Sequence, residues 1–158
     1  MNKNEKTNVM RVLEQKKIAY TPHTYTQDAS TSGVEIARIL GEDSGQVFKT
    51  LVTRGKTGAY YVFVIPVEGE LDLKKAAKVV GEKSIEMIKQ KELLPLTGYI
   101  HGGCSPIGMK KQFTTVIHET AMNYETIFFS AGKVGYQVEV APSDIGKVIR
   151  YELDDVVI

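Results

Sequence analysis

Lys49 is a charged residue within an otherwise largely apolar stretch that runs from Val47 to Val52. In a β-strand, alternation would put Lys49 on the same face as Val47 and Leu51. A lysine with apolar neighbours on both faces must snorkel, find a partner or lie at a cleft. In a cleft, its ammonium on a flexible stem can hold a carbonyl, a phosphate or a thiolate. At a sheet edge, the same charge would instead discourage aggregation. The pattern leaves both interpretations open.

A second candidate is the glycine-rich stretch 97–111, in which four of fifteen residues are glycine. Gly102 and Gly103 allow backbone conformations closed to other residues and let a ligand approach the main chain. The following Ser105-Pro106 favours a turn. Between two strands, such a loop can present backbone N–H groups to a ligand, although an ordinary tight connection has the same spacing. The stretch is not a P-loop, because Met109 stands where that motif has lysine.

Cys104 in this loop invites a nucleophile interpretation, since His101 lies three residues earlier. A lone cysteine is more often a small buried hydrophobe, and we favour that role here. No Ser-His-Asp arrangement is evident. The three histidines, His23, His101 and His118, are scattered over different predicted elements. We therefore expect no metal site and no cofactor.

Ser130 and Tyr25 are two further polar candidates. Ser130 opens a predicted hairpin turn, where its hydroxyl can face the same cleft or organise the backbone of Gly132 and Lys133. Tyr25 has an apolar body and a polar tip, which suits covering an adenine or a small side chain, but equally suits a core tyrosine. Spacing alone does not choose between these roles.

Length and composition favour one compact domain over residues 1–158, since 42% of the chain is hydrophobic. The net charge of +1 gives no basic surface for wrapping nucleic acid, and we expect no DNA partner. A single cysteine excludes an internal disulfide. The N-terminus lacks the apolar core of a signal peptide, and no apolar run approaches the roughly 20 residues of a membrane span. The expectation is a cytoplasmic protein without a membrane partner.

Helical periodicity and capping residues predict most of the helices. Thr7 is a plausible N-cap of the first, Gly41 a stop for the second, and Asp72 and Gly81 bound the third. Pro142 fits the first position of the last. The predicted helices are 5–17, 34–40, 72–80, a helical turn at 91–94 before Pro95, and 142 to about 150; residues 27–33 are a predicted polar loop.

Strands are predicted where branched and aromatic residues alternate between turn signals. Pro22 places the first at a sheet edge. The predicted strands are 20–25, a hairpin 46–54 and 59–67, 85–88, 114–117, a hairpin 127–131 and 136–141, and 156–158. Because the strands pair largely as hairpins, we predict an α/β fold with a mixed, largely antiparallel sheet curled toward a barrel and flanked by helices.

Five short stretches run in the same order as in a known protein family. They are His23-Thr24-Tyr25, Val47-Phe48-Lys49-Thr50-Leu51, residues 69–75, Gly98-Tyr99 with residues 102–108, and residues 129–133. Together they resemble the YbaK family, the freestanding relatives of the editing domain inserted in some bacterial prolyl-tRNA synthetases. The resemblance covers nearly the whole chain and implies the YbaK-like fold.

The resemblance also implies a set of site residues. Lys49 matches the functional lysine of the family, and Tyr25, Gly102 and Ser130 match positions that line its pocket. Gln137 departs from the family, in which the matching position carries an aspartate; this loses a carboxylate that could hold an amino group. The expected catalytic residue is Lys49, and the expected substrate-binding residues are Tyr25, Gly102, Gly103, Ser105, Ser130 and Gln137.

The activity that the resemblance implies is trans-editing, the release of misattached cysteine from Cys-tRNA(Pro). The family mechanism needs no protein nucleophile, because the thiol of the substrate attacks its own ester carbonyl. Two alternatives remain open: a deacylase that uses water on Ala-tRNA(Pro) or another small misacylated tRNA, and a non-catalytic module that binds tRNA or the synthetase. The expected partners are the aminoacyl-tRNA acceptor end and prolyl-tRNA synthetase.

Overall fold

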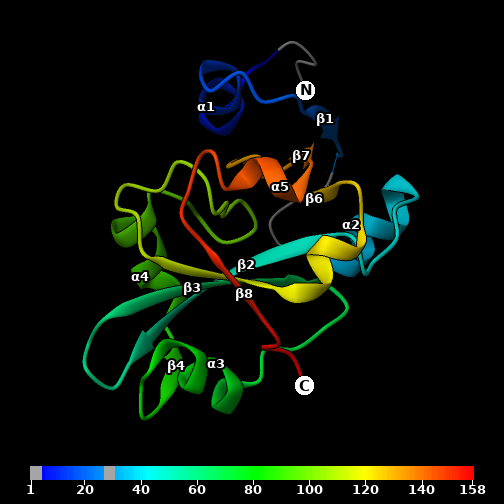
Figure 1. Cartoon of the computed structure of the whole chain (residues 1–158). Coiled ribbons are helices and arrows are strands. Elements are labelled where there is room, and N and C mark those ends of the chain that lie inside the picture. Colours follow the sequence, from blue (N-terminus) through cyan, green and yellow to red (C-terminus); the bar gives the residue numbers. More distant parts are fainter. Residues whose placement is uncertain (1–4, 27–30) are drawn as a thin grey trace.

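The computed structural model describes residues 5–26 and 31–158 and divides the strands between two sheets (Figure 1). The three-stranded sheet has the order β1-β7-β6, and the five-stranded sheet has the order β4-β2-β3-β5-β8. The strands are β1 Thr21–Thr24, β2 Phe48–Gly55, β3 Tyr60–Pro66, β4 Ile85–Met87, β5 Thr114–His118, β6 Ile127–Ser130, β7 Tyr136–Val140 and β8 Glu152–Asp154.

The expected α/β class with mixed, largely antiparallel pairing is confirmed. β2 pairs antiparallel with β3 and β4, and β7 pairs antiparallel with β1 and β6. The parallel pairs are β3 with β5 and β5 with β8. The strands do not form one sheet curled toward a barrel: the two sheets meet at an isolated parallel bridge between Val47 and Phe128. β1 lies at an edge, as Pro22 predicted.

The predicted capping residues Thr7, Gly41, Asp72 and Gly81 each cap their helix, but the first helix is shorter than the predicted 5–17. The Thr7 hydroxyl accepts a hydrogen bond from the Met10 amide, and the Asp72 carboxylate accepts from two amides of the third helix. Gly41 and Gly81 adopt the left-handed conformation that closes a helix. The helices are α1 Asn8–Gln15, α2 Gly33–Leu40, α3 Leu73–Val80, α4 Gln90–Thr97 and α5 Pro142–Ile145, with a 3₁₀ turn over Glu119–Asn123.

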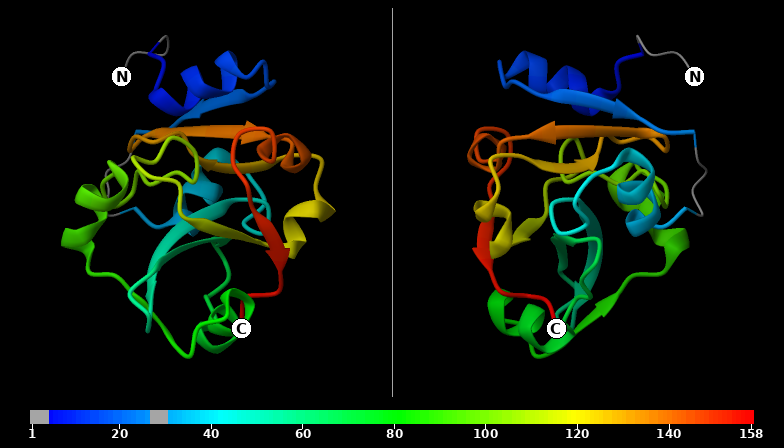
Figure 2. Two further views of the ribbon diagram at one scale, coloured as in Figure 1. Left: turned by 60° about the vertical axis from the view of Figure 1, so that its left-hand side comes forward. Right: turned by 90° about the vertical axis from the view of Figure 1, so that its right-hand side faces the viewer.

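Each of three helices covers a different part of the sheets. α1 lies over the three-stranded sheet at one end of the molecule, and α3 lies at the other end, near the C-terminus (Figure 2). The main core joins α1 to both sheets, and a second cluster packs α3 against β3. Ala37 of α2 packs with Val47, Val67 and Phe128, which lie where the two sheets meet. α2 thus covers the junction.

Three further predicted elements have the wrong boundaries. α4 continues through Pro95 to Thr97, where the Thr97 hydroxyl donates to the Leu93 carbonyl and helps to satisfy the last turn. α5 ends at Ile145, and the chain continues in turns in which the Lys147 amide donates to Asp144 and the Val148 amide donates to Ile145. The final strand is β8, which lies before the predicted 156–158.

The predicted loop 27–33 lies partly outside the described residues, since 27–30 are not among them. Within the described ranges, every helix is too short or too polar to cross a membrane.

Candidate functional site

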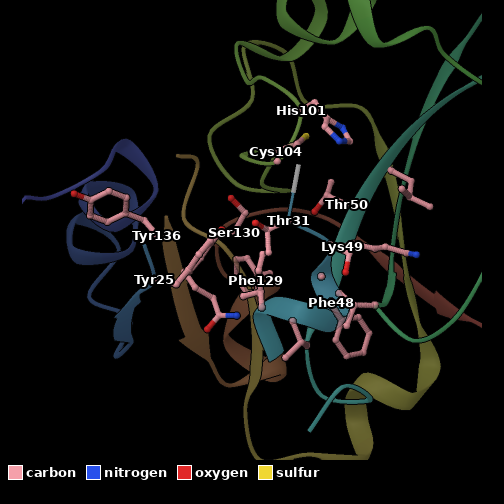
Figure 3. A pocket seen from close by; sticks show the side chains of 18 of the residues that line it. Tyr25, Thr31, Phe48, Lys49, Thr50, His101, Cys104, Phe129, Ser130 and Tyr136 are labelled. Carbon is pink, nitrogen blue, oxygen red and sulfur yellow. The ribbon is translucent and has the colours of Figure 1, made fainter. Parts of the chain in front are cut away.

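A cavity of about 420 Å³ lies where the two sheets part (Figure 3). Its wall comes from segments that are distant in sequence: the end of β1, the start of α2, the first half of β2, the glycine-rich loop and the β6–β7 hairpin. The lining residues are Tyr25, Thr31, Ser32, Gly33, Ile36, Val47, Phe48, Lys49, Thr50, Leu51, Val67, Leu93, His101, Gly102, Cys104, Phe129, Ser130, Tyr136 and Gln137.

The cavity follows from how the two sheets are joined. β2 and β6 run side by side at the bridge between Val47 and Phe128, and no further bridge joins the described residues that follow. On the same side of β2, β4 pairs only with Thr53–Gly55. No strand of the described ranges 5–26 and 31–158 therefore pairs with the edge of β2 around Thr50, and the space beside this edge is the cavity.

Thr50 presents polar groups at this edge. Just before β2, the Val47 carbonyl accepts from the Val67 amide, and at the end of β2 the Gly55 amide donates to the Ala59 carbonyl. The odd-numbered residues along this strand therefore direct their backbone hydrogen bonds toward β3. In an antiparallel ladder, the intervening residue Thr50 then turns its N–H and C=O to the open edge. The Thr50 hydroxyl is also buried without a hydrogen-bond partner in the described structure. Sequence reasoning missed this residue, because alternation describes the faces of a strand and not its edges.

Lys49 lines the cavity, but its ammonium points away from Tyr25 and Ser130 (Figure 3). Within the described residues, its ammonium makes no hydrogen bond or ion pair at short range. Burial lowers the pKa of the Lys49 ammonium, and the charge of Glu70 opposes this shift. Rotation about the side-chain bonds is needed before this charge reaches the centre of the cavity.

Ser130 and Tyr25 lie on the cavity wall. The Ser130 hydroxyl accepts a hydrogen bond from the Gly132 amide at 3.1 Å, so it organises the hairpin turn and faces the cavity at once. Its own proton remains to be donated. Tyr25 is 7% exposed, and burial raises the pKa of its phenol. Both roles considered from the sequence for Ser130 coexist in the structure.

The glycine-rich loop contributes Gly102 to the wall, with φ of +86°. Gly103 and Ser105 are not among the lining residues. A side chain at Gly103 would come within 3.1 Å of the Val134 amide, so glycine allows the loop to approach the β6–β7 turn. The buried Ser105 hydroxyl accepts from the Ile107 amide. These two residues shape the loop that presents Gly102.

Cys104 and His101 lie next to each other on the wall (Figure 3). Burial raises the pKa of the Cys104 thiol to about 12, so the thiol is protonated at neutral pH. The structure shows no hydrogen bond between these two described residues. A protonated thiol without a base is a poor nucleophile.

Gln137 lines the cavity and is 3% exposed. Its amide nitrogen donates a hydrogen bond to the Glu42 carboxylate at 3.0 Å. The Gln137 carbonyl oxygen and the second Glu42 oxygen are buried, and neither has a partner in the described structure. A carboxylate from another element thus lies beside the residue where the family carries aspartate. Sequence reasoning missed Glu42, because 95 positions separate the two residues.

His23 also lies on this side of the three-stranded sheet, cross-strand from Gln137. Its ring nitrogen is 3.0 Å from a Glu139 carboxylate oxygen, which makes the pair an ordinary polar contact. No group of three or more His, Cys, Asp or Glu side chains within 5–26 and 31–158 is placed to hold a metal ion.

Most of this chain matches the sequence model of a known protein family. The sequence model of the aminoacyl-tRNA editing domain matches residues 26–148. This range contains Lys49, the glycine-rich loop, Ser130 and Gln137.

The chain is 49% identical over 142 residues to EbsC of Enterococcus faecalis, a protein described provisionally as a Cys-tRNA(Pro)/Cys-tRNA(Cys) deacylase. The match covers 89% of this chain and 87% of EbsC. The proline–tRNA ligase of Thermosipho melanesiensis is 23% identical over 119 residues, which are 75% of this chain and 20% of the ligase. The chain therefore resembles about a fifth of that enzyme.

Solved structures with the same fold include a protein described provisionally as a trans-editing enzyme for prolyl-tRNA synthetase. Its TM-score is 0.81 at 23% identity, and the match covers 95% of this chain and 94% of the other. A hypothetical protein gives a TM-score of 0.85 at 20% identity, with 95% and 99% covered. At these identities, the likeness concerns the fold.

Proposed function

This chain belongs to the family of aminoacyl-tRNA editing domains, and we propose that it is a trans-acting deacylase that releases misattached cysteine from Cys-tRNA(Pro). The 49% identity to EbsC, a protein described as acting on this substrate, supports the proposal. We further propose that residues 1–158 act as one editing domain.

The need for such an enzyme follows from the limits of selection by size. Proline and cysteine are close in volume, and a compact apolar pocket rejects a near-isostere only weakly. A second site that hydrolyses the wrong product corrects the resulting error.

The observation that carries the proposal is the composition of the cavity. It has room for a small aminoacyl group, and it combines the Lys49 cation and the Ser130 hydroxyl with a loop glycine, Gly102. The one thiol of the chain, Cys104, is held protonated. A reaction in which the substrate supplies the nucleophile fits this combination.

In the proposed reaction, the cysteinyl thiol of the substrate loses its proton and its sulfur attacks the carbonyl carbon of its own ester. The C–S bond forms, the bond between the carbonyl carbon and the ribose oxygen breaks, and that oxygen takes up a proton. The products are free tRNA and a cyclic thiolactone, which water then opens to cysteine. The attack gains from being intramolecular, and a thiol is already a few per cent thiolate near neutral pH.

The residues of the chain orient the ester and stabilise charge. Lys49, once its side chain rotates inward, favours the thiolate and the developing oxyanion. The Ser130 proton and the backbone N–H groups at the open edge of β2 and in the glycine loop are available donors. The catalytic role therefore falls to Lys49, and Tyr25, Gly102, Ser130 and Gln137 contact the aminoacyl end.

The proposed partner is the acceptor end of tRNA, since a net charge of +1 offers little attraction for the whole tRNA body. Prolyl-tRNA synthetase is a second proposed partner, because a related domain lies within some of these ligases. We propose a cytoplasmic location, because aminoacyl-tRNAs are used there in protein synthesis.

The test is a comparison of deacylation rates and products with purified protein. We expect rapid release from Cys-tRNA(Pro) with thiolactone as the first product by mass analysis, far slower release from Ser-tRNA(Pro), and little from Ala-tRNA(Pro). Cys-tRNA(Cys) measures the contribution of the tRNA body. Free cysteine as the first product with comparable cleavage of Ala-tRNA(Pro) would establish water as the nucleophile. Binding of tRNA without release from any substrate would establish a non-catalytic module.

A further inference from the structure

Glu42 occupies a fixed position at the end of α2. Gly41 adopts φ of +70°, the Gly41 amide donates to the Arg38 carbonyl, and the Glu42 amide donates to the Ala37 carbonyl at 2.8 Å. These two bonds form a Schellman motif, which determines the backbone of the residue after the glycine. Ala37 in turn packs against both sheets at their junction. The backbone at Glu42 is therefore fixed, and the Glu42 carboxylate contacts Gln137 of the cavity wall.

Glu42 and Gln137 form a pair with too many acceptors. Their single mutual bond uses one Glu42 oxygen and one of the two amide protons of Gln137 that can be donated. The other Glu42 oxygen and the Gln137 carbonyl oxygen are buried and unpartnered in the described structure. Reversing the amide would put its oxygen against the carboxylate, so the orientation is fixed by Glu42. The pair lacks a hydrogen-bond donor.

Among the described residues, His23 is the only neighbour whose positive charge lowers the pKa of Glu42. A carboxylate at a helix C-terminus faces the negative end of the helix dipole. Burial raises the pKa of Glu42, the Glu139 charge raises it further, and the Gln137 bond and His23 oppose these shifts. Of these neighbours, His23 is already 3.0 Å from Glu139. A site that contradicts local preferences in this way is typical of a binding site whose ligand supplies the missing charge.

Gln137 connects this pair to the cavity. It is the cross-strand neighbour of Ser130 in the β6–β7 hairpin, and both residues line the cavity. Resting on the proposed function, we propose that Glu42 and Gln137 form the receptor for the α-ammonium group of the aminoacyl ester. The ammonium donates to the Gln137 carbonyl oxygen, and the Glu42 carboxylate behind the amide supplies the compensating charge. Glu42 is thus a specificity-determining residue contributed by α2.

Two ligands that differ only in the amino group test this assignment. The first is 3′-deoxy-3′-(cysteinylamino)adenosine, in which an amide replaces the labile ester; the second is its 3-mercaptopropanoyl counterpart, which lacks the amine. By calorimetry, we expect the wild-type protein to bind the amine-bearing ligand about 10-fold more tightly, as for a hydrogen bond to a charged group. In Glu42→Gln and in Gln137→Leu, the preference should fall to about twofold or less.

Glu139→Gln is the matched control. Glu139 lies two residues from Gln137 on the same face of β7 but is already bonded by His23 and Thr126, so its loss should leave the preference unchanged. Equal binding of the two ligands by wild type, binding of neither, or an unchanged preference in a folded Glu42→Gln protein overturns the ammonium site. Deacylation of Cys-tRNA(Pro) by the same wild-type protein separates this outcome from failure of the proposed function. If the protein deacylates Cys-tRNA(Pro) but does not prefer the amine-bearing ligand, the proposed editing activity stands and the ammonium site is wrong. If it prefers that ligand but does not deacylate Cys-tRNA(Pro), the ammonium site stands and the proposed function is wrong.

Discussion

α2 and α3 end in the same way and carry the same residue after the end. Each helix has eight residues and closes with a left-handed glycine, Gly41 or Gly81, followed by a glutamate. The Glu42 amide donates to Ala37 at 2.8 Å, and the Glu82 amide donates to Ala77 at 2.9 Å. Both glutamates therefore leave their helix with the same backbone geometry.

The carboxylates nevertheless have opposite environments. Glu82 accepts hydrogen bonds from the Thr57 hydroxyl at 2.5 Å, the Tyr61 phenol at 2.6 Å and the Thr57 amide at 3.1 Å. These bonds, that of the Thr57 hydroxyl above all, lower the pKa of Glu82. Glu42 has one bond, an unpartnered oxygen and a raised pKa. The same helix end, a left-handed glycine followed by a glutamate, thus has a structural role in α3 and is a candidate ligand-binding element in α2.

The largest expected effect lies at Lys49, which lines the cavity on the α2 side of the molecule and does not contact Glu82. Lys49→Ala should lose roughly 10²-fold or more of the deacylation rate, because it removes the cation that stabilises developing charge. Lys49→Arg should not restore the rate, because the planar guanidinium of arginine does not replace the compact ammonium of lysine. Deacylation kinetics on Cys-tRNA(Pro), with circular dichroism to verify folding, make the measurement. Near wild-type turnover in Lys49→Ala would reduce this residue to a charge that protects a strand edge.

The two helix ends should respond in opposite directions to the same substitution. Glu42→Gln should raise the free energy of unfolding by about 1 kcal/mol without ligand, because an amide at 42 can donate to the unpartnered Gln137 oxygen. Glu82→Gln should lower it, because a carboxylate that accepts three hydrogen bonds is lost. Urea unfolding of both variants at pH 7 compares them directly. A destabilised Glu42→Gln protein would show that the Glu42 carboxylate, like that of Glu82, stabilises the fold.

The pH dependence of stability should separate the two carboxylates on either side of the ordinary value of 4.5. Glu82 has a lowered pKa, so its contribution is complete above 4.5 and is lost as pH falls below it toward the folded-state value. Glu42 has a raised pKa, so its cost is complete above the folded-state value and disappears as pH falls from that value to 4.5.

Unfolding curves between pH 7 and pH 3 for wild type and the two glutamine variants test this order. The gain in Glu42→Gln should fade first on acidification, and the loss in Glu82→Gln should persist to lower pH. Coincident pH profiles for the two differences would contradict the contrast between the helix ends.

The smallest effect is expected at Cys104, which lines the same cavity but stays protonated. Cys104→Ala should keep its deacylation rate and lose about 1 kcal/mol of stability from packing. Cys104→Val, which refills the space, serves as the companion variant. A folded but inactive Cys104→Ala protein would show that Cys104 is the nucleophile. The mechanism in which the substrate thiol attacks its own ester would then be wrong.

Much of the fold was predictable because its signals are local. Thr7, Asp72, Gly41 and Gly81 were assigned as helix ends from the sequence, and each caps its helix in the structure. Capping depends on the side chain and backbone of a few neighbouring residues, so a short stretch contains the necessary information. The extent of α4 past Pro95 was misjudged, because satisfaction of its last turn depends on the Thr97 side chain as well as on the proline.

The site was predictable in part. The structure gathers Tyr25, Lys49, Gly102, Ser130 and Gln137 around one cavity, although the direction of the Lys49 ammonium was not foreseen. Gly103 and Ser105 lie off the wall, since a loop motif does not reveal which of its residues face inward. Thr50 was missed because its exposure at a strand edge depends on where β4 and β6 stop pairing.

The sequence by itself determined where α2 and α3 end and that a glutamate follows each, because a helix, a left-handed glycine and the next residue are linked by short-range hydrogen bonds. Only the tertiary structure decided what each glutamate contacts. The partners of Glu82 are 21 and 25 positions away in the neighbouring hairpin, whereas the partner of Glu42 is 95 positions away on β7. The packing of the two sheets brings three donors to the Glu82 carboxylate and leaves one oxygen of Glu42 without a donor in the described structure. No local sequence pattern specifies that packing.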